Sequence, residues 1–243
     1  MQSSDLDIFE SIGLLQMDTV SLMKRVDTKF VVNQITLPAI LESLYTNYQI
    51  LEINGTRMMT YDSTYFDTKD TQLYLAHHNK RANRAKVRVR TYVESNLSYL
   101  EVKLKDNAGI TSKKRIRVAH PTALLDAEKL DFIQQCTAQK WELSPSLTNR
   151  FNRFTLVNMR QKERVTFDLN LAYNGTTFHS NLAIIELKQE KLNRASPLYN
   201  VLKNAAIQPY TISKYCTGMA LLYPELKQNY FKHKLLTLTK ITS

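Results

Sequence analysis

Three consecutive segments of this sequence alternate charged and apolar residues with a period of two. Residues 84–93, 98–105 and 111–118 place charged, mostly basic side chains at alternate positions, with Lys114 as the one exception. Successive side chains of a β-strand point to opposite faces, so each segment predicts a strand with one charged and one apolar face. The segments that connect them are short and polar, as expected for an antiparallel meander.

The positive charge of the chain is concentrated in this same region. The 243 residues carry a formal net charge of +11, and residues 77–117, with twelve Lys or Arg and three Asp or Glu, carry +9 of it. Like charges that face each other on neighbouring strands are destabilising, and a solvated face would mix the two signs. The repeated basic face therefore indicates a bound polyanion or facing carboxylates.

Further segments complete a predicted α+β fold. Alternation or aromatic and β-branched residues favour strands at 26–32, 57–66, 149–158, 163–173 and 181–189. Apolar spacing and capping residues favour helices at 5–24, 36–48, 121–136, 196–206, 211–222 and 224–236. No repeat or linker divides the chain, so we expect one domain over residues 1–243, with strands from 26 to 189 and C-terminal helices from 196 to 236.

Scarce glycine and cysteine exclude several kinds of site. The five glycines fit neither GxxxxGK[ST] nor GxGxxG, so any phosphate has to be held by side chains. Cys136 and Cys216 stand apart, with no CxxC or Cys/His set that would indicate zinc. There is no apolar run long enough to span a membrane and no secretory signal, so a cytoplasmic location is expected.

The charged face is compatible with two architectures. An open sheet would expose it to nucleic acid, but aromatic stacking partners should then lie among the basic residues. Only Tyr92 and Tyr99 are aromatic in the three basic segments, and both lie near strand ends. A closed eight-stranded barrel would turn the charged face inward and line a pore suited to a triphosphate or a polyphosphate chain.

Motifs between residue 25 and about residue 224 resemble one known family. In order along the chain they are RVDTKF at 25–30, YFDT at 65–68, KVRVRTY at 86–92, LEVK at 100–103, Lys113 with Arg115, NR at 152–153, RVTFD at 164–168, IELK at 185–188 and SKY at 213–215. Together they resemble the catalytic domain of the vacuolar transporter chaperone (VTC) family, a polyphosphate polymerase module of the triphosphate tunnel metalloenzyme superfamily. The resemblance implies an eight-stranded antiparallel β tunnel, a closed barrel with flanking α-helices, in agreement with the eight strands counted above.

The activity that the resemblance implies is metal-dependent transfer of the terminal phosphoryl group of ATP onto a polyphosphate chain. Phosphoryl transfer needs mainly positioning and charge neutralisation, which fixed Arg and Lys side chains supply. Two alternatives stay open: a tunnel-type triphosphatase acting on inorganic or nucleoside triphosphate, and a non-catalytic binder of polyphosphate or nucleic acid. The ExExK motif of the hydrolase and cyclase branches is replaced here by RVDTK at 25–29, which favours the polymerase branch.

The matching positions also imply site residues. The expected catalytic cations, which would bind the phosphates, are Arg88, Arg90, Lys103, Lys113, Arg115, Arg153, Arg164 and Lys214. Further substrate-binding residues are expected at Lys29, Lys86, Lys188 and Ser213. Arg offers bidentate forks to phosphate, whereas Lys offers a point charge.

A divalent metal, Mn²⁺ or Mg²⁺, is the expected cofactor. Glu186 is its leading ligand and Glu101 the second, although Glu101 fits the role of a structural counter-ion equally well. Asp168 is expected to orient neighbouring cations, and the adjacent His77 and His78 to lie in a loop. The expected partners are ATP or another triphosphate and polyphosphate, without nucleic acid; a membrane protein, if involved, would be a separate chain. The oligomeric state stays open.

Overall fold

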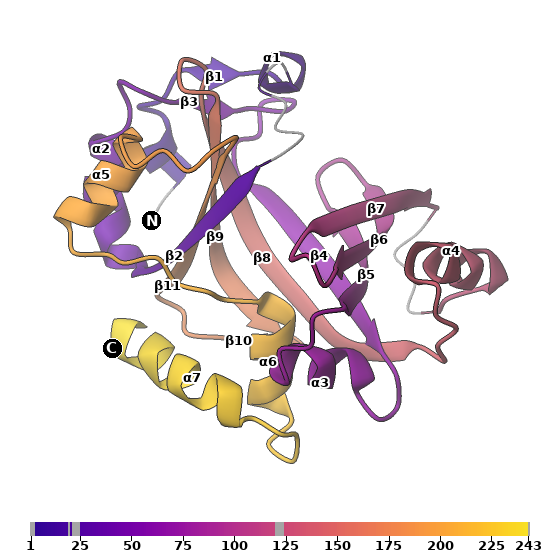
Figure 1. The fold of residues 1–243 in the computed structure, drawn as a ribbon. Helices are drawn as coiled ribbons and strands as arrows, with labels where there is room; N and C mark the ends of the chain where they lie inside the picture. The colour runs from indigo at the N-terminus through magenta and orange to yellow at the C-terminus, as the bar shows by residue number, and fades with distance from the viewer. Residues whose placement is uncertain (1–2, 19, 21–24, 120–123, 243) are drawn as a thin grey trace.

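The fold is built around one curled antiparallel sheet (Figure 1). The computed structural model describes residues 3–18, 20, 25–119 and 124–242. Its main strands lie in the spatial order β2-β11-β9-β8-β4-β5-β6-β7. Their bounds are β2 Val26–Asn33, β4 Met59–Asp67, β5 Arg84–Tyr92, β6 Leu97–Lys105, β7 Thr111–Val118, β8 Ser144–Asn158, β9 Glu163–Tyr173 and β11 Leu182–Gln189. All eight predicted strands are confirmed; β8 begins at Ser144 rather than at residue 149, and the ends of the other strands shift by no more than two residues.

Three short strands extend this sheet. β1 (Ser11–Ile12) pairs in parallel with β3 (Gln49–Leu51), and β3 in turn pairs with β8. β10 (Thr176–Thr177) pairs with the end of β9. These short strands do not pair with β2 or β7, which remain the two edge strands of the eight-stranded order.

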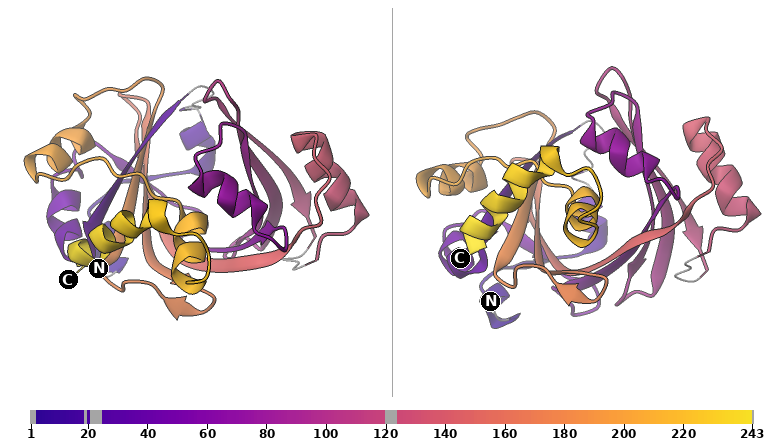
Figure 2. Two further views of the ribbon diagram at one scale, coloured as in Figure 1. Left: turned by 60° about the horizontal axis from the view of Figure 1, so that its bottom comes forward. Right: turned by 90° about the horizontal axis from the view of Figure 1, so that it is seen from below.

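The expected barrel is only partly confirmed, because backbone pairing does not close it. Figure 2 shows the sheet curving round an interior, from β2 and β11 on one side to β6 and β7 on the other. No hydrogen-bonded ladder joins β2 to β7 in the part of the chain that the structure describes. Both edges carry cations toward the interior, Lys29 on β2 and Lys113 on β7, and like charges on paired strands are destabilising. We call the interior on the concave side of the sheet the tunnel.

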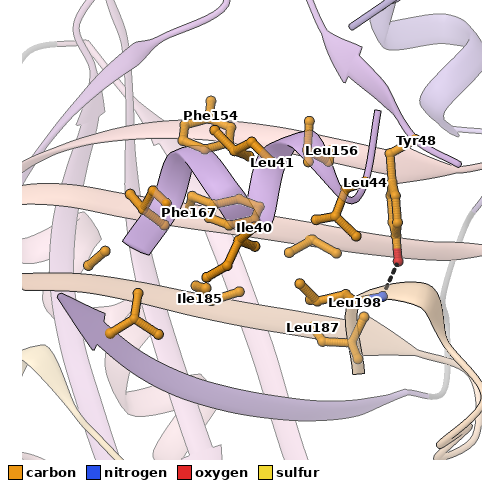
Figure 3. Close-up of a cluster of buried hydrophobic side chains, with 14 of the residues drawn as sticks. Ile40, Leu41, Leu44, Tyr48, Phe154, Leu156, Phe167, Ile185, Leu187 and Leu198 are labelled. Atoms are coloured by element: carbon orange, nitrogen blue, oxygen red, sulfur yellow. Dashed lines mark hydrogen bonds between the residues drawn. The ribbon is translucent and has the colours of Figure 1, made fainter. Parts of the chain in front are cut away.

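Helices cover the convex side of the sheet and bury its apolar face. α2 (Leu37–Glu42) and α5 (Pro197–Asn204) pack on β2, β11, β9 and β8, and Figure 3 shows Ile40 and Leu41 of α2 against Phe154, Phe167 and Ile185. On the other half, α4 (Ala127–Thr137) supplies Ile133 to a core with apolar residues of β5 and β6. Because the apolar faces of the strands are buried outward, their charged faces point into the tunnel.

Three helices gather at one end of the tunnel: α3 (Gln72–His78), α6 (Lys214–Leu222) and α7 (Asn229–Thr242). α6 comes unusually close to the sheet at Gly218, where a Cβ atom would lie 2.6 Å from Leu147 and 2.7 Å from Tyr173. A residue without a Cβ is therefore required at this contact. The close approach brings the first turn of α6, with Ser213 and Lys214, next to the tunnel.

Several predicted helices are wrong in their bounds. In place of a helix at 5–24 the chain forms a 3₁₀ turn at Ser3–Leu6, strand β1 and a short helix α1 (Leu14–Asp18); residues 19 and 21–24 lie outside the described part. Hydrogen bonds from the backbone near β3 to Glu10 and Ile12 compete here with the helix.

The other helices are displaced less. A 3₁₀ turn (Gln34–Thr36) precedes α2, which ends at Glu42 rather than near residue 48. α4 begins only at Ala127, where Asp126 caps it. Residues 120–123, the start of this predicted helix, lie outside the described part. α6 is capped by Ser213 rather than by Thr211, and the last helix runs from Asn229 to Thr242 rather than over 224–236. None of the helices that the structure describes is long and apolar enough to cross a bilayer.

Candidate functional site

The strand register aligns the charged residues of β5, β6 and β7 in rows across the tunnel wall. Arg88 pairs with Glu101, which pairs with Arg115 on the other side. The next row consists of Lys86, Lys103 and Lys113. Three cations in one row, with no carboxylate between them, place a high density of positive charge on this wall.

Glu101 is the buried counter-ion at the centre of this wall. Its carboxylate accepts hydrogen bonds from Arg88 Nε at 2.7 Å and Nη2 at 2.6 Å, and pairs with the ammonium group of Lys113. Burial alone would raise the pKa of Glu101, but Arg88, Arg90 and Lys113 outweigh it and lower the pKa to about 2. With its oxygens engaged by cations, Glu101 fits the counter-ion role better than that of a metal ligand.

This arrangement predicts that Glu101 contributes to stability in acid. Its pKa in the folded protein lies below the ordinary value of 4.5, so its contribution is present above about pH 4.5 and is lost as the pH falls toward about 2. In Glu101→Gln the free energy of unfolding, measured with urea at a series of pH values, should fall less steeply over this range. The exposed Glu225→Gln serves as control and should keep the slope of the unmodified protein. An unchanged slope in Glu101→Gln would contradict this assignment.

Asp168 forms a second buried cluster on the opposite side of the tunnel. Arg153 of β8 donates to both of its oxygens, at 2.5 Å from Nε and 2.7 Å from Nη2, and Lys214 of α6 forms an ion pair with it. These two cations hold the pKa of the Asp168 carboxyl well below its usual range in spite of burial. The sheet and α6 are thus locked together through one carboxylate, in keeping with the orienting role expected for Asp168.

Glu186 on β11 is a more open tunnel carboxylate than Glu101 or Asp168. Its side chain is 17% exposed, compared with 2% for Glu101 and 3% for Asp168. Lys188 lies 2.8 Å away and Lys29 3.5 Å away, and both oppose the effect of burial so that the pKa of Glu186 stays well below its ordinary value. Lys188 also donates to Thr166 at 3.1 Å. An ionised, partly open carboxylate between two lysines is available to an additional ligand.

Arg90 is a buried cation without a carboxylate partner. It is 6% exposed, donates from Nε to Ser63 Oγ at 3.2 Å, and lies over the rings of Tyr61 and Phe151 at 5.4 and 5.6 Å. Among the described residues no ion pair with Asp or Glu is formed, and burial together with Arg88 lowers its pKa to about 10. A cation in this state gains from a bound anion.

The side chains of β4 and β8 that hold these cations were not among the predicted site residues. Tyr65 accepts a hydrogen bond from Arg88 Nη1 at 3.0 Å, and its pKa is lowered to about 8 because Arg88 and Arg90 outweigh the effect of burial. Phe151 offers a ring face to Lys214 at 4.4 Å. A signal did exist: Tyr61, Ser63 and Tyr65 alternate along the strand that pairs with the basic strand β5.

The remaining expected residues lie at other points of the tunnel wall. Lys86 donates to Ser213 Oγ at 2.8 Å, and Arg115 lies over the ring of Tyr99 at 4.7 Å. Arg164 lies near the N-terminal segment, where it donates to the carbonyl of Met17 at 2.6 Å, rather than in the Asp168 cluster. Lys103 lies in the row between Lys86 and Lys113.

The prediction of a loop for His77 and His78 is wrong, since both lie in the last turn of α3. His77 Nε2 is 3.1 Å from the carbonyl of Ala85, and His78 accepts the backbone N–H of Tyr230 at 3.2 Å. Within the described ranges no group of three or more His, Cys, Asp or Glu could hold a metal ion. A metal would therefore have to complete its ligands from a bound phosphate or from water.

A curled antiparallel sheet that encloses a cation-lined interior defines the class of triphosphate tunnel proteins. The structure resembles that of HpAC1 from Hippeastrum, a candidate adenylyl cyclase with a dominant triphosphatase activity, with a TM-score of 0.52 and 14% identity over 82% of this chain and 96% of that chain. A candidate adenylate cyclase from Vibrio parahaemolyticus matches with a TM-score of 0.48 and 9% identity, over 81% of this chain and 98% of that chain. At 14% identity the likeness to HpAC1 concerns the fold alone.

Comparison of the sequence with family models assigns the chain to one family within this class. The VTC domain model matches residues 24–223, so this chain belongs to the VTC domain family. No curated protein matches the sequence significantly. α7 lies beyond the matched residues.

Proposed function

We propose that the protein is a polyphosphate polymerase that transfers the terminal phosphoryl group of ATP onto a polyphosphate chain inside the tunnel. The observation that carries this proposal is the unbalanced positive charge of the interior, where Arg90 is buried without a carboxylate and Lys86, Lys103 and Lys113 share one row. A ligand with many negative charges and a small cross-section satisfies such an interior. Membership of the VTC domain family supports the same substrate class.

In the proposed reaction a terminal oxygen of the polyphosphate chain attacks the γ-phosphorus of ATP. A new P–O–P bond forms, the bond between the γ-phosphorus and the bridging oxygen to the β-phosphate breaks, and ADP leaves with that oxygen. The protein contributes fixed charges that stabilise the equatorial oxygens in the transition state. Arg88 and Arg153, each already oriented by a carboxylate, are the forks we assign to the reacting phosphates.

The remaining cations extend this binding site along the tunnel. Lys214 and Ser213 present the first turn of α6 to the anion. The other residues that we assign to phosphate binding are Arg90, Lys103, Lys113, Arg115, Arg164, Lys29, Lys86 and Lys188. Because Arg153 and Lys214 share Asp168, a phosphate that binds one of them is positioned against the other. Substrate binding thus uses a prearranged set of charges and needs little reorganisation.

A divalent metal fits the site only together with the substrate. Mg²⁺ is commonly held by one or two carboxylates and substrate phosphates rather than by a complete protein cage. Glu186 provides such a carboxylate, whereas Glu101 is held between Arg88 and Lys113 and is assigned as counter-ion. When bound, Mg²⁺ or Mn²⁺ would supply further neutralisation of phosphate charge.

The test is to incubate the purified protein with ATP and Mn²⁺ and to separate the products by gel electrophoresis. Release of ADP together with phosphate chains longer than three units is expected. Phosphate release without such chains would overturn the proposal in favour of a triphosphatase. Glu186→Gln should lose turnover while it retains affinity for tripolyphosphate; full turnover in this variant would remove Glu186 from the metal site.

A further inference from the structure

A second basic cavity lies at the end of the tunnel, beside the C-terminal helix. Its volume is about 220 Å³, and the cations that line it are Lys80, Arg84, Lys86, Lys103, Lys105 and Lys234. No Asp or Glu is found among its lining residues. The cavity is therefore more one-sided in charge than the tunnel walls, where Glu101, Asp168 and Glu186 balance part of the positive charge.

The cavity is continuous with the tunnel through shared side chains. Lys86 and Lys103, which form one row of the tunnel wall, also line the cavity, as does Ser213 at the start of α6. Burial lowers the pKa of Lys86, and the charges of Lys29 and Arg88 lower it further. An anion that reaches from the tunnel into the cavity would relieve this repulsion.

α7 supplies the outer wall of the cavity and fixes two of its ammonium groups. Lys234 of α7 donates to the carbonyl of Thr211 at 3.0 Å and lies 5.0 Å from the centre of the Tyr230 ring. Lys80, which follows α3, lies 4.6 Å from the centre of the same ring. Tyr230 thus serves as a support for two lysines, which leaves its ring poorly suited to stack on a nucleotide base.

α7 is not part of the family match, which ends at residue 223. In Figure 1 the helix lies next to α6 at the end of the sheet where α3 is also found. The wall that carries Tyr230 and Lys234 therefore lies outside the matched VTC region. Membership of the family does not by itself imply a ligand site there.

We propose that this cavity binds the distal phosphates of a linear polyphosphate, beyond those held in the tunnel, and thereby favours long chains over short ones. The inference rests on the proposed function, because it takes polyphosphate as the ligand of the tunnel. Six cations with hydroxyl groups of Thr111, Thr211 and Thr217 match a ligand that carries charge at every unit along its length. A short ligand such as tripolyphosphate, once seated in the tunnel, would not extend to Lys80 and Lys234.

The test compares two ligands on two matched variants of the full chain by isothermal titration calorimetry. Lys80→Ala/Lys234→Ala removes two cations from the cavity and leaves the tunnel residues in place. Its affinity for a long linear polyphosphate should fall about tenfold, which corresponds to about 1.4 kcal/mol, while its affinity for tripolyphosphate stays unchanged. The control Lys232→Ala/Lys240→Ala removes two exposed cations from the same helix, neither of which lines the cavity, and should bind both ligands like the unmodified protein.

Three outcomes would overturn the inference: no loss of affinity in the cavity variant, an equal loss for both ligands, or the same loss in the control. Thermal unfolding of each variant shows whether α7 still packs as in the unmodified protein. If Lys80→Ala/Lys234→Ala weakens α7, Lys80→Gln/Lys234→Gln keeps most of the side-chain volume and must give the same difference between ligands. Calorimetry measures binding without turnover. A failure to synthesise polyphosphate would therefore reject the proposed function, but it would not change the measured difference in affinity between long polyphosphate and tripolyphosphate.

Discussion

Arg88→Ala should lower the rate of phosphoryl transfer by about two to three orders of magnitude, the loss typical for removal of one preorganised group that stabilises transition-state charge. The guanidinium of Arg88 is held on two sides, by the Glu101 carboxylate and by the Tyr65 hydroxyl. Such a group cannot be replaced by a mobile lysine nearby, because its orientation is fixed before the substrate binds. The measurement is the rate of ADP formation under saturating ATP and polyphosphate.

Two further variants make this result specific. Arg88→Lys keeps the charge and loses the fork, so it should recover only a small part of the rate. Arg150→Ala removes an arginine on the convex side of β8, where it pairs with Asp62 at 3.0 Å, and should leave the rate unchanged. A rate in Arg88→Ala within a factor of a few of the unmodified protein would show that Arg88 does not contact the reacting phosphates.

Asp168→Ala should have the largest effect on stability, a loss of about 3–5 kcal/mol. The substitution leaves Arg153 and Lys214, whose side chains are only 15% and 14% exposed, without the carboxylate that both contact. It also removes the ion pair that joins α6 to the sheet. Urea unfolding at neutral pH measures the change.

The control for this stability effect is Asp62→Ala, which breaks the exposed pair with Arg150 and should cost no more than about 1 kcal/mol. Tripolyphosphate should restore part of the stability of Asp168→Ala, because a bound phosphate supplies negative charge to the same two cations. Equal stability losses in the two variants would contradict the idea that Asp168 compensates the positive charges of Arg153 and Lys214.

The strands and their charged faces could be predicted from the sequence because alternation is a local property. Val87 and Val89 alternate with Arg88 and Arg90, and this pattern alone fixes which side chains share a face. Whether that face points to solvent or to an interior depends on what covers the apolar side. α4 and the pair α2 and α5 provide this cover, and the packing of these helices is not encoded in the pattern of any one strand.

The clusters of the site depend on contacts that a single sequence does not display. Arg153 and Asp168 meet because β8 and β9 pair with a particular register, and Lys214 joins them only because α6 approaches at Gly218. The predicted helix at 5–24 failed for a similar reason. Ile12, one of its apolar residues, lies in β1, whose pairing with β3 is a tertiary interaction that overrides the local preference.

The position of β2 at the edge of the sheet has a consequence for the order of folding. Val26 of β2 pairs with Gln189 of β11, and β11 is the only strand partner of β2 in the described sheet. β2 is among the first strands to leave the ribosome, whereas β11 is the last. The pairs β4–β5, β5–β6 and β6–β7, in contrast, join strands that follow one another in the sequence and can form early. Pairing over such a distance slows folding, because the long intervening loop has to be closed first. During synthesis the apolar residues Phe30 and Val32 remain without their final neighbours, and a chaperone that shields this segment should raise the yield of folded protein.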